Sequence, residues 1–203
     1  MLAFDHLAIS AKTLEAGVDW LEACLGVRMA GGGQHPLMAT HNRLIGLGDL
    51  YLEVIAIDPD APAPPHPRWF DLDRFSGPPR LTNWIARCDD LDAALTAAPT
   101  GTGVPLALAR GDFRWRMAVP PSGILPFDGA FPALIQWQGS AHPAPLLPDL
   151  GLRLERLEIA HPEAPALTAA LSGLIQDPRI TITTGPRTLR ATIATPHGRR
   201  VLQ

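Results

Sequence analysis

The segment LAFDHLAIS (residues 2–10), followed by LEAGVDWLEACL (residues 14–25), predicts a strand that leads directly into a helix. The first segment is mostly apolar, and the second spaces its apolar residues as a helix does, before Gly26, a residue type that ends helices. Two further copies of this order are residues 81–88 with 91–98 and residues 152–160 with 164–171. One strand–helix pattern therefore organises the chain three times.

Each strand–helix pair is followed by short β-patterned segments separated by turn residues, which predicts a βαβββ unit. These segments are 27–30, 40–47 and 50–57 in the first unit, 104–109, 113–119 and 133–137 in the second, and 180–183, 189–195 and 199–202 in the third. Gly48 and Asp49 form the turn of a predicted hairpin in the first unit, and Gly111 lies in the corresponding turn of the second.

The predicted fold class is α+β, with units at 1–57, 80–138 and 152–203 in a single body that spans residues 1–203. Proline-rich segments at 58–67 and 142–148 separate the units. Neither has the length or polarity of a free linker, so we interpret both as ordered surface crossovers. The third unit is shorter throughout, and we expect it to cap the sheet instead of forming a site.

Composition and charge exclude several classes of protein. The 203 residues are 46% hydrophobic and 18% charged, with a net charge of -3 and Lys12 as the only lysine, so no basic stripe is available for nucleic acid. The N-terminus lacks the basic and apolar regions of a signal peptide, and no segment is apolar enough to span a membrane. We therefore expect a cytoplasmic protein that binds neither nucleic acid nor membrane, with Cys24 and Cys88 as unpaired thiols.

Several motifs together resemble the glyoxalase-like domain family of the vicinal-oxygen-chelate superfamily, which also holds bleomycin-resistance proteins and dioxygenases. The motifs are FDHLAI (4–9), GGQHPLMATHNRL (32–44), YLEVI (51–55), ILPFDG (124–129) and LIQW (134–137). The resemblance implies paired βαβββ units that curl into an open cup, a partly closed mixed sheet with its helices outside. It also implies divalent-metal ligands on the first and last strands of each unit.

By order along the chain, the four ligand positions that the resemblance implies fall at His6, Glu53, Trp84 and Gln136. Trp has no lone pair for a metal, so at most His6, Glu53 and Gln136 ligate a divalent ion. A different interpretation stays open, in which His6 and Glu53 hydrogen-bond each other or Arg43. Gln136 is a weak ligand that would serve equally well by binding backbone or substrate.

Further residues are candidates for catalysis or for substrate binding. His41, with Glu53, is a candidate acid–base group, and His35 and Asn42 would bind substrate near the mouth of the cup. Turn or surface histidines explain the same pattern. The other substrate-binding candidates are Arg114 and Arg116 as a clamp for an anion, and Trp84 and Phe127 as walls of an apolar pocket. A solvated sheet face and ordinary core packing are the alternatives for these four.

The expected function is small-molecule chemistry of the metal-assisted lyase, isomerase or dioxygenase type. Replacement of the fourth ligand by Trp84 favours a second interpretation, a non-catalytic binding or resistance protein that uses the same cup. A small-molecule ligand is the expected partner in both cases, and a homodimer is a candidate assembly. The metal hypothesis predicts up to one bound divalent ion, lost in both His6→Ala and Glu53→Ala.

Overall fold

The computed structural model describes all of residues 1–203 and contains two β-sheets and three α-helices. The first unit comprises β1 (Ala3–Ser10), α1 (Leu14–Leu25), β2 (Ala30–His35), β3 (Thr40–Gly46) and β4 (Tyr51–Ile57). The second comprises β5 (Arg80–Arg87), α2 (Leu91–Ala97), β6 (Val104–Arg110), β7 (Phe113–Val119) and β8 (Ala133–Trp137). The third comprises β9 (Arg153–His161), α3 (Ala164–Leu171), β10 (Ile180–Thr184), β11 (Thr188–Thr195) and β12 (Gly198–Leu202).

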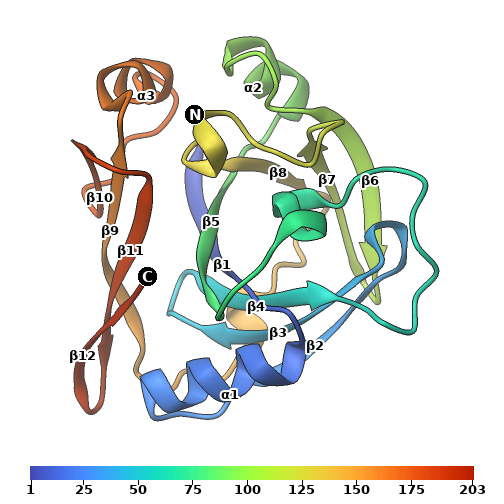
Figure 1. Ribbon diagram of the computed structural model, residues 1–203, viewed down its shortest axis with the longest axis vertical. Helices are drawn as coiled ribbons and strands as arrows, with labels where there is room; N and C mark the ends of the chain where they lie inside the picture. Colours follow the sequence, from blue (N-terminus) through green and yellow to red (C-terminus); the bar gives the residue numbers. More distant parts are fainter.

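The first two units form one eight-stranded mixed sheet in the order β2-β3-β4-β1-β5-β8-β7-β6. Within each unit the first strand pairs in parallel with the last, and the units meet where β1 and β5 run antiparallel. The sheet curls into a half-barrel (Figure 1), so its edge strands β2 and β6 approach each other. Gly33 permits this approach, because a Cβ there would lie 2.5 Å from Cδ of Arg110. The predicted α+β class with a curved, partly closed sheet is confirmed.

The third unit does not extend the curled sheet. Its strands form a separate four-stranded sheet in the order β10-β9-β11-β12, seen beside the half-barrel in Figure 1. Here the first strand, β9, pairs in parallel with β10, whereas β1 pairs with β4. Leucines and isoleucines of this sheet join the same apolar cluster as α1 and the helix-facing side of the half-barrel. The third unit therefore repeats the order of elements but not their pairing.

One predicted strand of the first unit is misplaced. The sequence predicts a strand at 27–30, whereas β2 begins at Ala30. The carboxylate of Glu22 accepts hydrogen bonds from the backbone N–H of Met29 and from the Arg28 side chain, which ties residues 28 and 29 to the end of α1. Cys24 and Cys88 are free, as the sequence predicts.

The two faces of the curled sheet carry different side chains. Leu7, Leu52 and Val54 point toward the helices, while Ala8 and Ile55 belong to a second apolar cluster on the concave side. This separation follows from the period-two alternation of a strand. The concave side is covered by η2 (Trp69–Arg74), a short 3-10 segment that lies within the curl in Figure 1.

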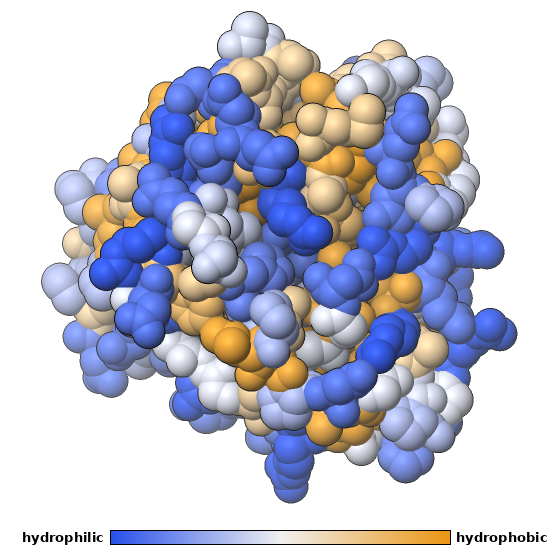
Figure 2. Space-filling view, turned by 180° about the vertical axis from the view of Figure 1, so that it is seen from behind, coloured by the Kyte–Doolittle hydropathy of each residue, from blue (hydrophilic) through white to orange (hydrophobic).

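None of the helices combines the length and the apolar character needed to cross a membrane. Hydrophilic side chains cover much of the face shown in Figure 2, and a hollow lies near its centre.

Candidate functional site

A small cavity lies between the concave face of the sheet and η2. It measures about 30 Å³ and is partly open to solvent. Its lining comprises His6, His35, Asn42, Leu44, Tyr51, Glu53, Trp69, Phe70, Arg110, Trp115, Met117, Ile135 and Trp137. We call this space the concave cavity. The first unit supplies most of its polar wall, and the second unit supplies half of its apolar residues, namely Trp115, Met117, Ile135 and Trp137.

His6 and Glu53 converge in the concave cavity from neighbouring strands. In the parallel pairing of β1 with β4, Ala8 lies beside Glu53 and His6 beside Tyr51, so the His6 and Glu53 side chains point to one face. Nε2 of His6 lies 3.6 Å from Oε1 of Glu53, and the two residues are only 4% and 5% exposed. The Tyr51 ring stacks on the His6 imidazole with 4.2 Å between centroids. The structure thus brings together two residues 47 positions apart in the sequence.

Asp5 binds the Nδ1 side of the His6 ring, and a β-bulge in β1 makes this contact possible. The pairing of β1 with β5 passes from Phe4 opposite Ala86 to His6 opposite Ile85, so Asp5 has no partner in the ladder. Such a bulge re-aims a side chain, and here it lets consecutive residues contact each other. Nδ1 of His6 lies 2.6 Å from Oδ1 of Asp5, which is fully buried.

The second oxygen of Asp5 is bound by two aromatic donors. Oδ2 accepts hydrogen bonds from Nε1 of Trp137 at 3.0 Å and from Nε2 of His142 at 3.0 Å. Nδ1 of His142 accepts from the backbone N–H of Ala144, which leaves the proton on Nε2. Burial alone would raise the pKa of Asp5, but the hydrogen bonds from His142 and His6 hold it well below its usual value. Asp5 is therefore a fixed buried anion beneath His6.

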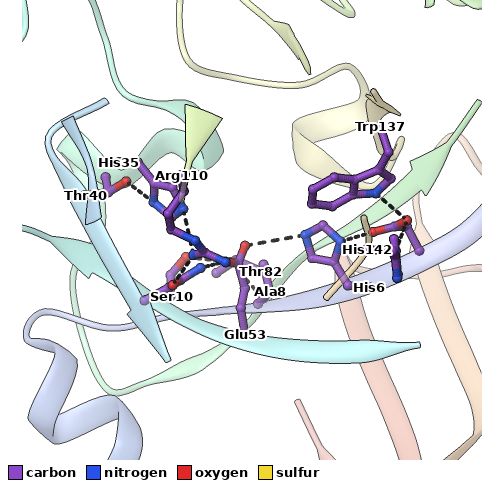
Figure 3. A network of polar contacts seen from close by, with 12 residues as sticks. His6, Ala8, Ser10, His35, Thr40, Glu53, Thr82, Arg110, Trp137 and His142 are labelled. Atoms are coloured by element: carbon purple, nitrogen blue, oxygen red, sulfur yellow. Dashed lines mark hydrogen bonds and ion pairs between the residues drawn. The ribbon is translucent and has the colours of Figure 1, made fainter. Parts of the chain in front are cut away.

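Glu53 lies between His6 and Arg110 in Figure 3, and Asn42 links its carboxylate to the Arg110 guanidinium. Nδ2 of Asn42 donates to Oε2 of Glu53 at 2.7 Å, while Oδ1 of Asn42 accepts from Nη1 of Arg110 at 2.9 Å. The same guanidinium nitrogen lies 3.4 Å from Nε2 of His35, and Nδ1 of His35 contacts the Thr40 hydroxyl at 3.2 Å. Burial lowers the pKa of His35 to about 4, so this imidazole is neutral near pH 7.

The pKa shifts of His6 and Glu53 indicate an ion pair. Burial opposes a charge on His6, but the hydrogen bond with Asp5 and the charges of both carboxylates raise its pKa to about 9. Burial would raise the pKa of Glu53, yet His6 lowers it. The distance of 3.6 Å between Nε2 of His6 and Oε1 of Glu53 is longer than a hydrogen bond. Both atoms can therefore still form a hydrogen bond with a ligand. A donor and an acceptor thus stand side by side in the concave cavity.

Two of the predicted positions, Trp84 and Gln136, lie outside this constellation. Trp84 pairs with Leu7 and shares its helix-facing side, where its Nε1 donates to the carbonyl of Ala130. Gln136 donates from Nε2 to the carbonyl of Asp89 at 2.7 Å, at the start of α2. Ile135 and Trp137, its neighbours, are the residues of β8 that line the concave cavity. The structure therefore places Gln136 away from His6, and Trp84 outside the lining of the concave cavity.

The other predicted candidates that miss the concave cavity are one histidine, two arginines and one phenylalanine. His41 alternates with Asn42 on β3 and points to the other face of the strand. Arg114 donates to the carbonyls of its own hairpin turn, and Arg116 pairs with Asp92 of α2 at 2.9 Å. Phe127 packs edge-on against His161 of the second sheet. Of the expected substrate-binding residues, His35 and Asn42 do line the concave cavity.

The residues that sequence reasoning missed are Asp5, Arg110, Trp69, Trp137 and His142. Asp5 could have been found from the sequence. It forms, with His6, two consecutive polar residues inside an apolar strand, which breaks period-two alternation and is typical of a bulge. Arg110 and His142 gave no local signal, since they lie 68 and 137 residues from the side chains that they bind.

The donor set does not fit a resident divalent metal. Catalytic metal sites keep about three protein ligands, and only Nε2 of His6 and the Glu53 carboxylate are available here. The second-unit residue that pairs with His6 is Ile85. The second-unit residues that line the cavity supply no carboxylate or imidazole; they are Arg110, Trp115, Met117, Ile135 and Trp137. No cluster of three or more His, Cys, Asp or Glu side chains that could hold a metal occurs in the structure.

We expect protein purified without chelator to carry far less than one equivalent of any divalent metal, because two donors with a protonated imidazole bind such ions weakly. Elemental analysis by mass spectrometry measures this content. One equivalent of metal that disappears in both His6→Ala and Glu53→Ala would contradict this expectation and restore the metal hypothesis.

Comparison with known proteins places the chain in a family. The model of the glyoxalase-like domain matches residues 4–175, whereas no curated protein matches the sequence. A hypothetical protein from Staphylococcus aureus is 12% identical, with a TM-score of 0.61 over 91% of this chain and 86% of that one. This likeness shows a common fold.

Weaker structural likenesses exist to two methylmalonyl-CoA epimerases. The Mycobacterium tuberculosis enzyme is 17% identical, with a TM-score of 0.44 over 70% of this chain and 94% of that one. The Streptomyces coelicolor enzyme, in complex with 2-nitronate-propionyl-CoA, is 15% identical, with a TM-score of 0.46 over 70% of this chain and 100% of that one. Neither bears on the activity of this chain. With 4–175 of its 203 residues matched by the family model, the chain belongs to the glyoxalase-like domain family.

Proposed function

We propose that the concave cavity binds a small carbonyl compound and that His6 and Glu53 move a proton next to its oxygen, as in an isomerase or a lyase. One observation carries this proposal: a hydrogen-bond donor, Nε2 of His6, and a carboxylate oxygen of Glu53 stand 3.6 Å apart in a small, partly open cavity. Because these two atoms do not hydrogen-bond each other, both can bind a substrate. Proton abstraction next to a carbonyl needs such a pair.

Each residue of the network has a part in this chemistry. The substrate oxygen accepts a hydrogen bond from the protonated His6, which stabilises the negative charge that develops there. Glu53, kept ionised by its lowered pKa, takes the proton from the adjacent carbon. Asp5 keeps His6 charged and oriented, and Asn42 fixes the Glu53 carboxylate through a hydrogen bond of 2.7 Å. A dioxygenase would need a metal site, for which the second unit supplies no donors.

The apolar wall of the cavity sets the kind of substrate. Trp115, Trp137 and Met117 line the cavity that holds the ion pair, which suits a flat or aliphatic body attached to the carbonyl group. Trp69 and Phe70 of η2 form part of the cavity wall, so a movement of η2 would enlarge the space for a substrate. Within η2, Phe70 has a left-handed φ of 58°, a conformation that costs a non-glycine residue free energy and marks a segment held under local strain.

Deuterium exchange tests the proposal directly. The protein is incubated in D₂O with a panel of small 2-oxo acids, 2-hydroxyaldehydes and thioesters, with and without EDTA, and exchange at the carbon next to the carbonyl is followed by proton NMR. We expect catalysed exchange with at least one class, unaffected by EDTA. Thermal shift on the same panel reports binding separately.

Binding without turnover is the second candidate function, and the apolar residues that make up more than half of the cavity lining favour it. Compounds that raise the melting temperature but show no exchange would support this candidate and overturn the enzymatic proposal. A panel in which no compound binds or exchanges would overturn both.

A further inference from the structure

A second cavity lies where the half-barrel meets the second sheet. It measures about 210 Å³, several times the volume of the concave cavity, and Phe70 lines both. Its polar lining comprises Asp71, Arg74, Arg80, Thr82, Asn83, Asp128 and Arg187. Arg187 comes from the turn between β10 and β11 and reaches across to β5, where its Nη2 donates to the carbonyl of Thr82 at 2.7 Å. We call this space the intersheet cavity.

Two arginines in the intersheet cavity have no carboxylate partner. No carboxylate oxygen lies within 4.0 Å of Arg80 or Arg187, whereas Arg74 in the same lining forms two hydrogen bonds to Asp71 at 2.8 and 2.9 Å. Nε of Arg187 is buried and has no acceptor in the protein. Arg80 is held over the Phe75 ring at 4.4 Å and donates only to backbone carbonyls. Buried donors without an acceptor are costly, which points to a bound acceptor.

A neutral donor completes the arrangement. Asn83 is only 4% exposed, lines the intersheet cavity and makes no side-chain hydrogen bond within the protein. Gly129, at a φ of 82°, lies between the two, because a Cβ there would be 3.1 Å from Nη2 of Arg187 and 3.2 Å from Nδ2 of Asn83. A glycine at this position keeps the space between the two donors open. The remaining carboxylate, Asp128, is exposed and forms no ion pair.

We propose that the intersheet cavity binds the oxyanion of a small molecule, a carboxylate or phosphate group, through Arg80, Arg187 and Asn83. Guanidinium groups bind both kinds of oxyanion by charge-assisted hydrogen bonds. Two unpaired cations face one exposed carboxylate, so the balance of charge favours an anion. The site is separate from His6 and Glu53 and does not depend on the proton-transfer chemistry proposed above.

Isothermal titration tests the proposal with inorganic phosphate and acetate as probes, at constant ionic strength maintained with chloride. We expect saturable binding of at least one probe, weakened tenfold or more in Arg187→Gln and in Arg80→Gln. Asn83→Ala should weaken it by a smaller factor. The tighter probe identifies the source of the oxyanion, phosphate or carboxylate.

Controls separate a specific site from general charge effects. Arg114→Gln removes an arginine bound only to backbone carbonyls of a distant hairpin and should leave the affinity unchanged. Glu53→Gln should also leave it unchanged, so failure of this site and failure of the proposed activity are distinguishable. If Arg187→Gln does not fold because it lacks the hydrogen bond to Thr82, Arg80→Gln still tests the site. Absence of saturable binding, or equal affinity in wild type and both arginine variants, would overturn the proposal.

Discussion

Replacing Asp5 with alanine is expected to lower the free energy of unfolding by about 3 to 5 kcal/mol, the cost of removing one partner from a buried ion pair. The carboxylate is fully buried and binds His6, Trp137 and His142. Its loss leaves three donors without an acceptor and a buried imidazolium without its nearest counter-charge. Urea denaturation of the wild type and the variant measures the difference.

A surface aspartate provides the control. Asp149 also forms an ion pair, with Arg153 at 2.8 Å, but both side chains are largely exposed. Exposed ion pairs contribute little to stability because solvent screens them, so Asp149→Ala should change the free energy of unfolding little. If Asp5→Ala cost no more than Asp149→Ala, the buried network would not be the charged assembly described here.

The charged state of His6 also makes stability depend on pH. Its pKa is raised from 6.5 to about 9, so the folded protein binds a proton more tightly than the unfolded chain does. The contribution of His6 is fully present below pH 6.5 and is lost as pH rises through about 9. We expect the free energy of unfolding to fall by about 3 kcal/mol over this window. Asp5→Asn should move the fall to lower pH, and a window unchanged in that variant would contradict the assignment.

Replacing Glu53 with glutamine is expected to reduce exchange of the substrate proton by a factor of about 10² to 10⁴, the usual contribution of a general base. The amide keeps the size of the carboxylate, and its oxygen still accepts the hydrogen bond from Asn42. It has no basic oxygen to take a proton. Exchange rates in D₂O, with ligand affinity from thermal shift, separate loss of chemistry from loss of binding.

Glu155→Gln is the matched control, because Glu155 lies on β9 of the second sheet and pairs with Arg199, far along the chain from the network. Its exchange rate should equal that of the wild type. Retention of full activity in Glu53→Gln would assign the base to another residue.

The pattern of elements could be predicted from the sequence because local features decide it. Predicted strands at 113–119 and 133–137 coincide with β7 and β8, and Gly48 lies in the hairpin between β3 and β4. Period-two alternation and turn residues act over a few positions, so neighbouring residues suffice to predict them.

The sequence did not predict which side chains of the second unit point to the concave face of the sheet. Aligning strands by order along the chain placed Trp84 and Gln136 with His6, whereas the ladder pairs His6 with Ile85. A shift of one residue moves a side chain to the other face of a sheet. The bulge at Asp5 introduces such a shift in the strand that carries the site.

The remaining site residues depend on tertiary structure. Arg110 reaches Asn42 only because the sheet curls until its two edge strands meet, and His142 reaches Asp5 from a loop after β8. No spacing in the sequence encodes either contact. The sequence of the first unit therefore predicted part of the site, and the remaining residues reach it only in the folded, curled sheet.

Nitrogen-15 NMR of the His6 ring shows whether a charged imidazole stands between the Asp5 and Glu53 carboxylates without a bound metal. We expect protons on both ring nitrogens at pH 7, loss of one proton near pH 9, and the same spectrum after treatment with chelator. A neutral ring at pH 7, or an Nε2 signal that changes when metal is removed, would contradict it.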